Sequence, residues 1–103
     1  MKAVFRDRHD RIDYLKACEE ARRVLADPSL LQSAREYLEA AMAPQANLQA
    51  HVARWRVVLA LPAAQVAALL VEDSAEGQAL RETRPVFGRG LSSQDVARLV
   101  AAG

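Results

Sequence analysis

The chain has 103 residues, of which 51% are hydrophobic and 26% are charged, and its formal net charge is +1. This length and composition predict one globular domain with a modest core and exclude a disordered chain. A net charge so close to zero creates no overall field that would hold nucleic acid or an anionic membrane. The single cysteine, Cys18, excludes an internal disulfide and favours a reducing compartment.

The hydropathy pattern argues against a membrane or secreted protein. No apolar run approaches the roughly 18 residues that a membrane span needs. The N-terminal region also lacks the apolar segment of a signal peptide. We therefore expect a cytoplasmic location and no membrane contact.

The N-terminal region predicts an arm followed by a helix. Residues 1–9 combine a short apolar start with a densely charged stretch, and they are expected to form the arm. The spacing of apolar residues over about 10–26 predicts the first helix. Its expected inward face comprises Ile12, Tyr14, Leu15, Cys18, Ala21 and Leu25.

Prolines divide the middle of the chain into three further helices. Pro28 suits the first position of a helix over about 28–42, because it lacks an N–H that this position leaves unbonded. A third helix is expected over about 45–60, and Pro62 begins a short fourth helix. The clearest apolar stripe lies on the third helix and comprises Leu48, Val52, Trp55 and Leu59.

Capping signals position the last two helices. Asp73 and Glu76 have the spacing of a capping box and predict a fifth helix over about 74–83. Ser92 and Asp95 have the same spacing and predict the C-terminal helix.

The combined pattern predicts an all-α fold of five to six short helices in a single compact domain, residues 1–103. Its expected parts are an N-terminal arm over 1–9, a helical core over 10–83, a loop rich in Arg, Pro and Gly over 84–91, and a C-terminal helix over 92–103.

No group of residues has the pattern of an active site. His9 and Asp13 lie one helical turn apart with Asp10 between them, but a metal site needs three or four converging groups and a supporting second layer. Cys18 falls on the apolar stripe of the first helix, which is typical of a small core residue rather than of a nucleophile. No glycine-rich phosphate loop or dinucleotide fingerprint occurs. The sequence therefore predicts a protein that is not an enzyme and holds no metal or cofactor.

A DNA-binding interpretation meets an electrostatic obstacle. Residues 61–70 resemble the first helix of a helix-turn-helix, but the recognition helix would then begin with the acidic run 72–76, which would repel phosphates. The sequence thus argues against nucleic-acid binding by the monomer. The alternative function is a small dimeric DNA-binding regulator that gathers Arg81, Arg84 and Arg89 from two copies.

The stretch from Arg81 to Gly90 is the candidate binding surface, with two interpretations open. Its apolar residues could tuck beneath the last helix, or the stretch could be an exposed recognition loop with a Val-Phe pair on the surface. Arginine and aromatic residues are enriched at interface hot spots, and Pro with Gly fixes a shape at low entropic cost. The candidate partner-binding residues are Arg81, Arg84, Val86, Phe87 and Arg89.

The same region carries a resemblance to known proteins. Its residues, which follow the helix containing Trp55, are Glu72-Asp73-Ser74, Gly77, Leu80-Arg81-Glu82-Thr83 and Pro85-Val86-Phe87. This pattern resembles small uncharacterised helical proteins of GC-rich bacteria, some of which are similar to antitoxin partners in two-gene toxin–antitoxin modules. The chain departs from well-known antitoxins because it has no recognisable DNA-binding half and no long toxin-wrapping tail.

The resemblance covers roughly residues 10–100 and implies a non-enzymatic neutraliser or regulator. The expected partner is another protein, with the product of an adjacent gene as the first candidate. A homodimer is a second expectation.

Overall fold

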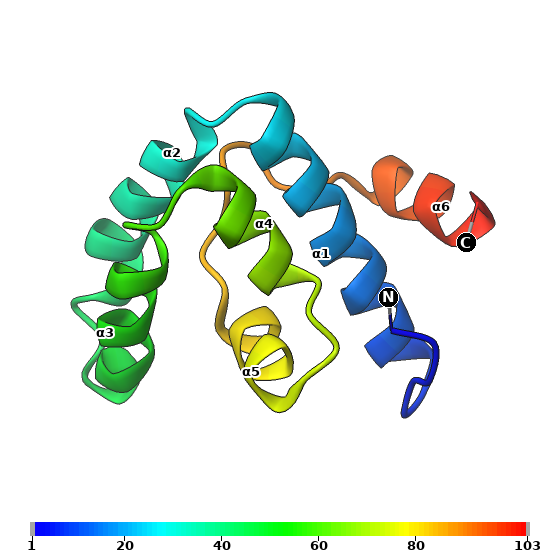
Figure 1. Cartoon of the computed structure of the whole chain (residues 1–103), viewed down its shortest axis with the longest axis horizontal. Helices are drawn as coiled ribbons and strands as arrows, with labels where there is room; N and C mark the ends of the chain where they lie inside the picture. The colour runs from blue at the N-terminus through cyan, green and yellow to red at the C-terminus, as the bar shows by residue number, and fades with distance from the viewer. Residues whose placement is uncertain (1, 103) are drawn as a thin grey trace.

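A computed structural model describes residues 2–102, and all regular structure within that range is helical (Figure 1). A π-helical turn, Leu38–Met42, extends the second helix, and a short 3-10 turn, Ala46–Leu48, leads into the third. The predicted all-α fold of five to six short helices is confirmed. The α-helices are α1 (Arg8–Ala26), α2 (Leu30–Tyr37), α3 (Gln49–Val58), α4 (Ala63–Leu70), α5 (Ala75–Thr83) and α6 (Ser93–Ala102).

Among the described residues, no helix is both long enough and apolar enough to cross a membrane. The N-terminal arm is shorter than predicted, because α1 begins at Arg8. Met1, the first residue of the predicted arm, and Gly103, the last residue of the predicted C-terminal helix, lie outside the described residues.

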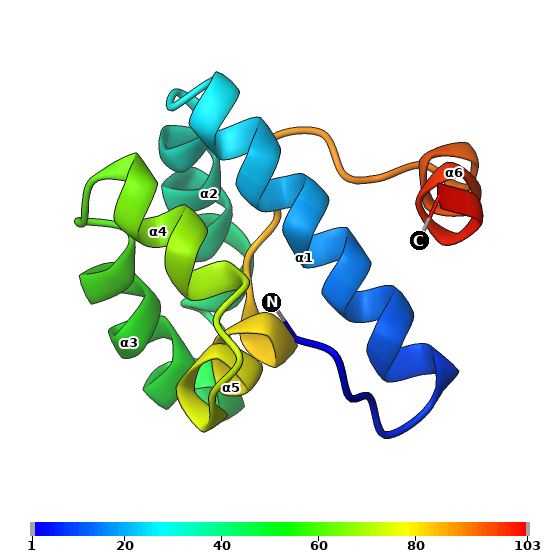
Figure 2. The same cartoon turned by 45° about the vertical axis from the view of Figure 1, so that its right-hand side comes forward.

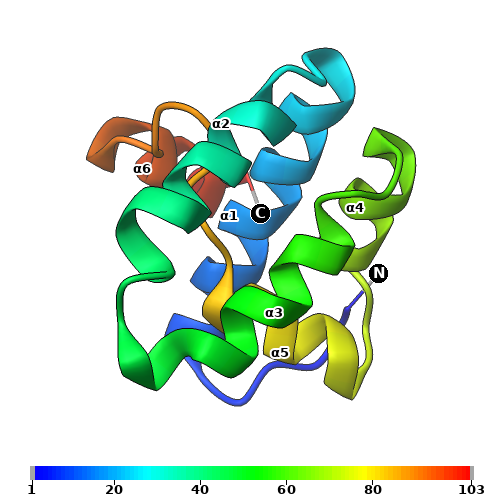
Figure 3. The ribbon, with the colours of Figure 1, turned by 90° about the vertical axis from the view of Figure 1, so that its left-hand side faces the viewer.

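The helices are arranged around α1, which is the longest of them. α4 packs alongside α1, α2 also contacts α1, and α6 lies beyond the other flank of α1 (Figures 1 and 2). Figure 3 shows the side formed by α2 and α3, with α5 next to α3. An ion pair between Arg54 and Glu76 joins α3 to α5.

Trp55 is at the centre of the core. Its side chain is fully buried, and its indole Nε1 donates a hydrogen bond to Thr83 Oγ1 at 3.1 Å. Its ring meets Phe87 edge-to-face, with the centroids 6.1 Å apart. The predicted stripe of the third helix is confirmed, with Leu48 half-buried at its edge. The buried side chains around Trp55 include Val24, Leu31, Leu38, Met42, Val52, Val58, Leu59, Val66, Leu70 and Leu80.

The inward face of α1 is rotated from the predicted one. Tyr14 and Ala21 are buried as predicted, but Ala17 and Val24 join them, and Leu25 is 56% exposed. The prediction that Leu25 faces the core is therefore wrong. The difference arises from tertiary packing. Because α1 contacts α4 on one flank and α6 on the other, its apolar residues spread over a wide arc of the helix. Ile12, Leu15 and Cys18 are half-buried on the flanks.

The start of α5 differs from the prediction by one residue. Ser74, not Asp73, is the N-cap, and its Oγ accepts a hydrogen bond from the backbone N–H of Gly77 at 3.0 Å. The backbone of Glu72 also lies close to Gly77. Only glycine fits at this position, because a Cβ there would lie 2.1 Å from the carbonyl oxygen of Glu72. The predicted capping box of Asp73 and Glu76 is therefore wrong.

The capping box of α6 is confirmed. Ser92 Oγ accepts from the backbone N–H of Asp95, and Asp95 Oδ2 accepts from the backbone N–H of Ser92, both at 3.0 Å. Both bonds are local, which explains why the sequence signal was sufficient to locate this helix start.

The position of Trp55 generates a stability prediction. Replacing Trp55 with Ala should lower the free energy of unfolding by about 3–5 kcal/mol, because it leaves a large cavity in the core and removes the hydrogen bond to Thr83 Oγ1. Denaturant unfolding followed by circular dichroism measures the loss. The matched control is Val57→Ala on the same helix: Val57 is 68% exposed, and its replacement should change stability by about 0.5 kcal/mol or less. Equal losses in the two variants would contradict the assigned core.

Candidate functional site

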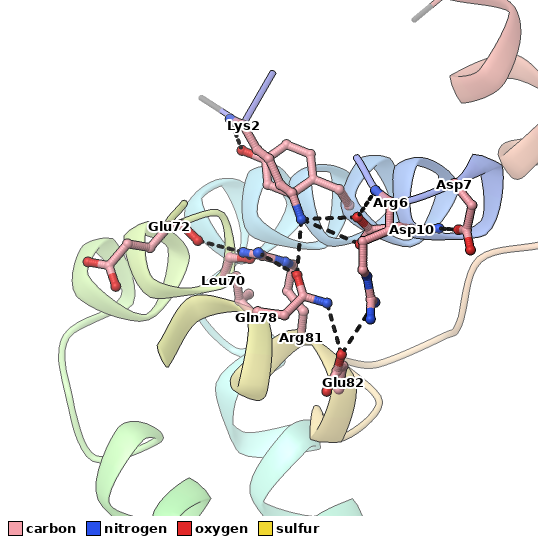
Figure 4. Close-up of polar contacts among 10 residues, drawn as sticks. Lys2, Arg6, Asp7, Asp10, Leu70, Glu72, Gln78, Arg81 and Glu82 are labelled. Carbon is pink, nitrogen blue, oxygen red and sulfur yellow. Dashed lines mark hydrogen bonds and ion pairs between the residues drawn. The ribbon is translucent and has the colours of Figure 1, made fainter. Parts of the chain in front are cut away.

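Arg81, the first candidate residue, is a buried structural contact. Its side chain is 2% exposed, and Nη1 donates to the carbonyl oxygens of Leu70 at 3.3 Å and Glu72 at 2.7 Å (Figure 4). Nη2 donates to Gln78 Oε1 at 3.0 Å, and the guanidinium lies 5.0 Å from the centroid of the Tyr14 ring. Arg81 therefore connects α5 to the end of α4 and to α1, and its guanidinium is turned away from any partner in this conformation.

The N-terminal arm completes the same polar cluster. Lys2 Nζ donates to Asp10 Oδ2 and to Gln78 Oε1, both at 3.2 Å (Figure 4). The backbone N–H of Arg6 donates to Asp10 Oδ2 at 3.0 Å, and this bond, together with Lys2, lowers the pKa of Asp10. Arg6 also lies 3.6 Å from a carboxylate oxygen of Glu82. The cluster is thus a closed internal network of matched donors and acceptors.

Arg84, the second candidate residue, attaches the 84–91 loop to α1. Its side chain is 12% exposed, Nε donates to Glu20 Oε2 at 2.8 Å, and Nη1 donates to Asp13 Oδ1 at 3.1 Å. Burial raises the pKa of Glu20, and the adjacent Arg84 guanidinium opposes that rise. Beneath the loop lies a hollow of about 340 Å³ lined by charges of both signs. Such a lining has no preference for a cation or an anion.

Phe87 is a core residue, which agrees with the tucked interpretation of the loop and not with an exposed Val-Phe pair. It is 4% exposed and packs edge-to-face on Trp55. The chain can turn directly after it because Gly88 adopts a positive φ of 69°. A Cβ at Gly88 would also lie 2.6 Å from Leu30 Cδ2, so the loop approaches α2 closely.

Val86 and Arg89 are the candidate residues that remain on the surface. Val86 is 36% exposed, and Arg89 is exposed with no ion pair to any of residues 2–102. The structure therefore does not gather the five candidates into one exposed patch. It follows the tucked arrangement of the loop, with Arg81, Arg84 and Phe87 turned inward.

A groove between α1 and α4 is a surface feature that the sequence did not reveal. Its volume is about 570 Å³, and its lining is apolar except for Arg22 on the rim. The wall on α1 follows a spacing of four, three and four residues, which places its members on one face of the helix. The lining residues are Tyr14, Cys18, Ala21, Arg22 and Leu25 of α1 and Ala64, Ala67, Ala68 and Val71 at α4.

One end of this α1–α4 groove is closed and the other is open. At the closed end, Tyr14 Oη donates to the carbonyl oxygen of Val71 at 2.9 Å and accepts from the backbone N–H of Lys2 at 3.2 Å. At the open end, Leu25 is 56% exposed. The alanines of α4 keep the groove open, because a larger side chain at those positions would fill it. Alanines at this spacing are also ordinary in any helix, so the sequence carried no distinct signal of a groove.

A second hollow continues from the open end toward the 84–91 loop. It has a volume of about 300 Å³ and shares Arg22 with the α1–α4 groove. Arg89, one of the predicted partner-binding residues, lies on its wall with Leu30 and Phe87. Arg22 and Arg23 of this hollow are paired with Glu19, so Arg89 is its arginine without an ion pair to any of residues 2–102.

The structure also locates the residues weighed for catalysis or metal binding. Within residues 2–102, no three His, Cys, Asp or Glu side chains are grouped as a metal site requires. Asp10 and Asp13 are instead paired with Lys2 and Arg84. Burial raises the pKa of the Cys18 thiol, which keeps it protonated and poorly nucleophilic in the groove wall.

The fold and this surface define an all-α protein with an open apolar groove between two helices. A scan of protein-family models, a search of curated proteins and a search of solved structures each returned no match. Function must therefore be inferred from the surface itself.

The placement of the loop residues generates a second prediction. Phe87→Ala should lower the free energy of unfolding by about 3–5 kcal/mol, because it removes a buried ring from the core. Arg89→Ala, its control in the same loop, should change stability by about 0.5 kcal/mol or less because the side chain is exposed. Thermal or denaturant unfolding compares them. A Phe87→Ala protein as stable as the control would mean that the loop is free in solution.

Proposed function

We propose that this chain is a non-enzymatic, cytoplasmic interaction protein, an antitoxin-like or regulatory partner of another bacterial protein. Its binding surface is the α1–α4 groove, extended by Arg22 and Arg89. The observation that supports this proposal is the exposure of Leu25, 56% accessible at the open end of a groove whose other lining is nearly all apolar. Contiguous apolar hollows of this kind are typical of interaction sites.

The shape of the groove favours a helix as the bound element. Two adjacent helices with small side chains between them leave a channel that a third helix can enter along its length. Recognition of this type places an apolar stripe of the partner, at i, i+3, i+4 and i+7, against the groove. The exposed Arg89 near the open end favours a partner helix that carries an acidic residue next to that stripe. The product of an adjacent gene is the first candidate partner.

The rival function, a dimeric DNA-binding regulator, has less support. Two of the three arginines that it would use are engaged internally, Arg81 with backbone carbonyls and Arg84 with two carboxylates. Only Arg89 of that set is exposed.

Blocking the groove tests the proposal. Ala68 is exposed on the groove wall, so Ala68→Glu should leave stability nearly unchanged while placing a charge in the apolar channel. We expect binding to the protein encoded by the adjacent gene to weaken by about 1–3 kcal/mol, measured by calorimetry with purified proteins. The matched control is Ala53→Glu, the same change at an exposed position of α3 away from the groove. Equal affinities of the two variants would exclude the groove as the binding surface.

The same purified protein separates the proposal from its rival. With a net charge of +1 and two of three arginines internally paired, it should bind duplex DNA only in the roughly 10⁻⁴–10⁻⁶ M range typical of non-specific contacts, or more weakly. A mobility-shift assay at physiological salt measures this affinity. Sub-micromolar, sequence-dependent binding would support the regulator instead.

A further inference from the structure

The C-terminal helix α6 is attached to the rest of the fold chiefly through α1. None of its described residues is buried, and its principal neighbour is α1. Val96, Leu99 and Val100 are half-buried along one side. Figures 1 and 2 show α6 beyond α1, on the side away from the other helices.

One ion pair fixes the side of α1 on which α6 docks. Arg23 Nη2 lies 3.5 Å from Asp95 Oδ2, and both side chains are largely shielded from solvent. Ile12, half-buried, lies on the same stripe of α1 as Arg23, because eleven residues complete about three helical turns. This docking side lies about 140° around α1 from Cys18 in the α1–α4 groove, since the two residues are five positions apart. The groove and the α6 contact therefore lie on different flanks of α1, but they adjoin, because Arg23 also lines the second hollow and Glu19 pairs with both Arg22 and Arg23.

The segment before α6 has the properties of a hinge. Phe87 is the last buried residue, and Arg89 and Gly90 after it are exposed. A Cβ at Gly90 would meet nothing within 4 Å, so the fold does not constrain the backbone there by contact. Gly90 also has the widest choice of backbone angles. The chain can change direction at this point without disturbing the core.

α6 carries its own stabilising contacts. Its capping box joins Ser92 to Asp95, and Arg98 forms an ion pair with Asp95 one turn later. The hydrogen bonds from Ser92 lower the pKa of Asp95 to about 2, so the cap persists at neutral pH. All of these groups lie within residues 92–98. The helix therefore keeps its cap when it leaves α1.

We propose that α6 is an exchangeable arm: it undocks from α1 of its own chain and docks on α1 of a second copy, which returns its own α6. A second copy is the partner that fits, because its α1 presents the same Ile12 and the same Arg23 to an incoming α6. Exchange of this kind makes a symmetric dimer that repeats the existing contacts and changes only the hinge. The short connection to its own α1 acts as a millimolar effective concentration, so the closed monomer dominates in dilute solution.

Charge reversal provides the direct test. Arg23→Glu places a carboxylate opposite Asp95 and next to Glu19 in one variant, and Asp95→Arg places a guanidinium opposite Arg23 and next to Arg98 in the other. Each variant alone therefore repels its own arm. In an exchanged pair of the two, the introduced carboxylate meets the introduced guanidinium at one contact, and the original Arg23 meets the original Asp95 at the other. Both contacts become attractive. Asp95→Arg also removes the capping box of α6. That loss is the same in the separate and the mixed samples, so it does not affect the comparison between them.

Light scattering on the two variants, separate and mixed in equal amounts, measures the outcome. We expect the mixture to dimerise at a concentration roughly tenfold or more below that of either variant alone. A mixture whose mass equals the average of its components at every concentration would overturn the proposal. Dimerisation abolished by Ala68→Glu but indifferent to the charge reversal would also overturn it, because that dimer would form through the α1–α4 groove.

Hinge length provides an independent test. Deleting Arg89 and Gly90 shortens the connection by about 7 Å, which prevents α6 from reaching its own α1 and should make the full chain dimeric. Inserting Gly-Ser-Gly after Gly90 relaxes the connection and should keep it monomeric at the same concentration. A folded, monomeric deletion variant would contradict the exchange.

Discussion

The buried guanidinium of Arg81 is the contact on which the rest of the arrangement depends. It carries a charge into a site that is 2% exposed, yet no carboxylate of residues 2–102 forms an ion pair with it. Its compensation comes from the carbonyls of Leu70 and Glu72, at and just beyond the negative end of α4, and from the Tyr14 ring. Because an uncompensated buried charge costs several kcal/mol, α5 must cross the end of α4 beside α1. The starting point of the 84–91 loop is thereby fixed.

The features that could be predicted from the sequence are those with local causes. Pro62 and the Ser92–Asp95 capping box act within a few residues, so the helices that follow them begin next to the predicted residue. The prediction that Pro28 takes the first helical position is wrong, because α2 begins at Leu30 with Ser29 as its N-cap. The Trp55 stripe was also clear, because one face of α3 meets the core and its other face meets solvent. α1 was harder, because it has neighbours on more than one flank and its buried alanines carry little hydropathy signal. Its face was therefore misplaced although its extent was nearly right.

The candidate site could not be predicted for a different physical reason. A loop that contains arginine and phenylalanine has the same sequence pattern whether these side chains contact a partner or the protein's own core. Here Arg84 reaches Asp13 and Glu20, more than 60 residues away in the chain, and Phe87 reaches Trp55. Pairings at such sequence separation depend on how α1 and α5 pack together, and no local sequence pattern indicates that packing. The α1–α4 groove is likewise a product of packing, since neither helix alone has a hollow.

The separation of surfaces around α1 has a consequence for regulation. One face of this helix is buried in the core, a second lines the α1–α4 groove, and a third receives α6. Because the groove and the α6 contact lie on different flanks, a partner helix and an exchanged arm can be held at the same time. Any coupling between them must then pass through α1 itself, whose core face is anchored by Ala17 and Val24 and whose Glu19 pairs with both Arg22 and Arg23. A close-packed helix transmits strain between its faces, because packed interiors have low compressibility. The two surfaces are therefore expected to influence each other, so an exchange of α6 that frees or re-forms the Arg23 contact should also change the affinity of the adjacent groove.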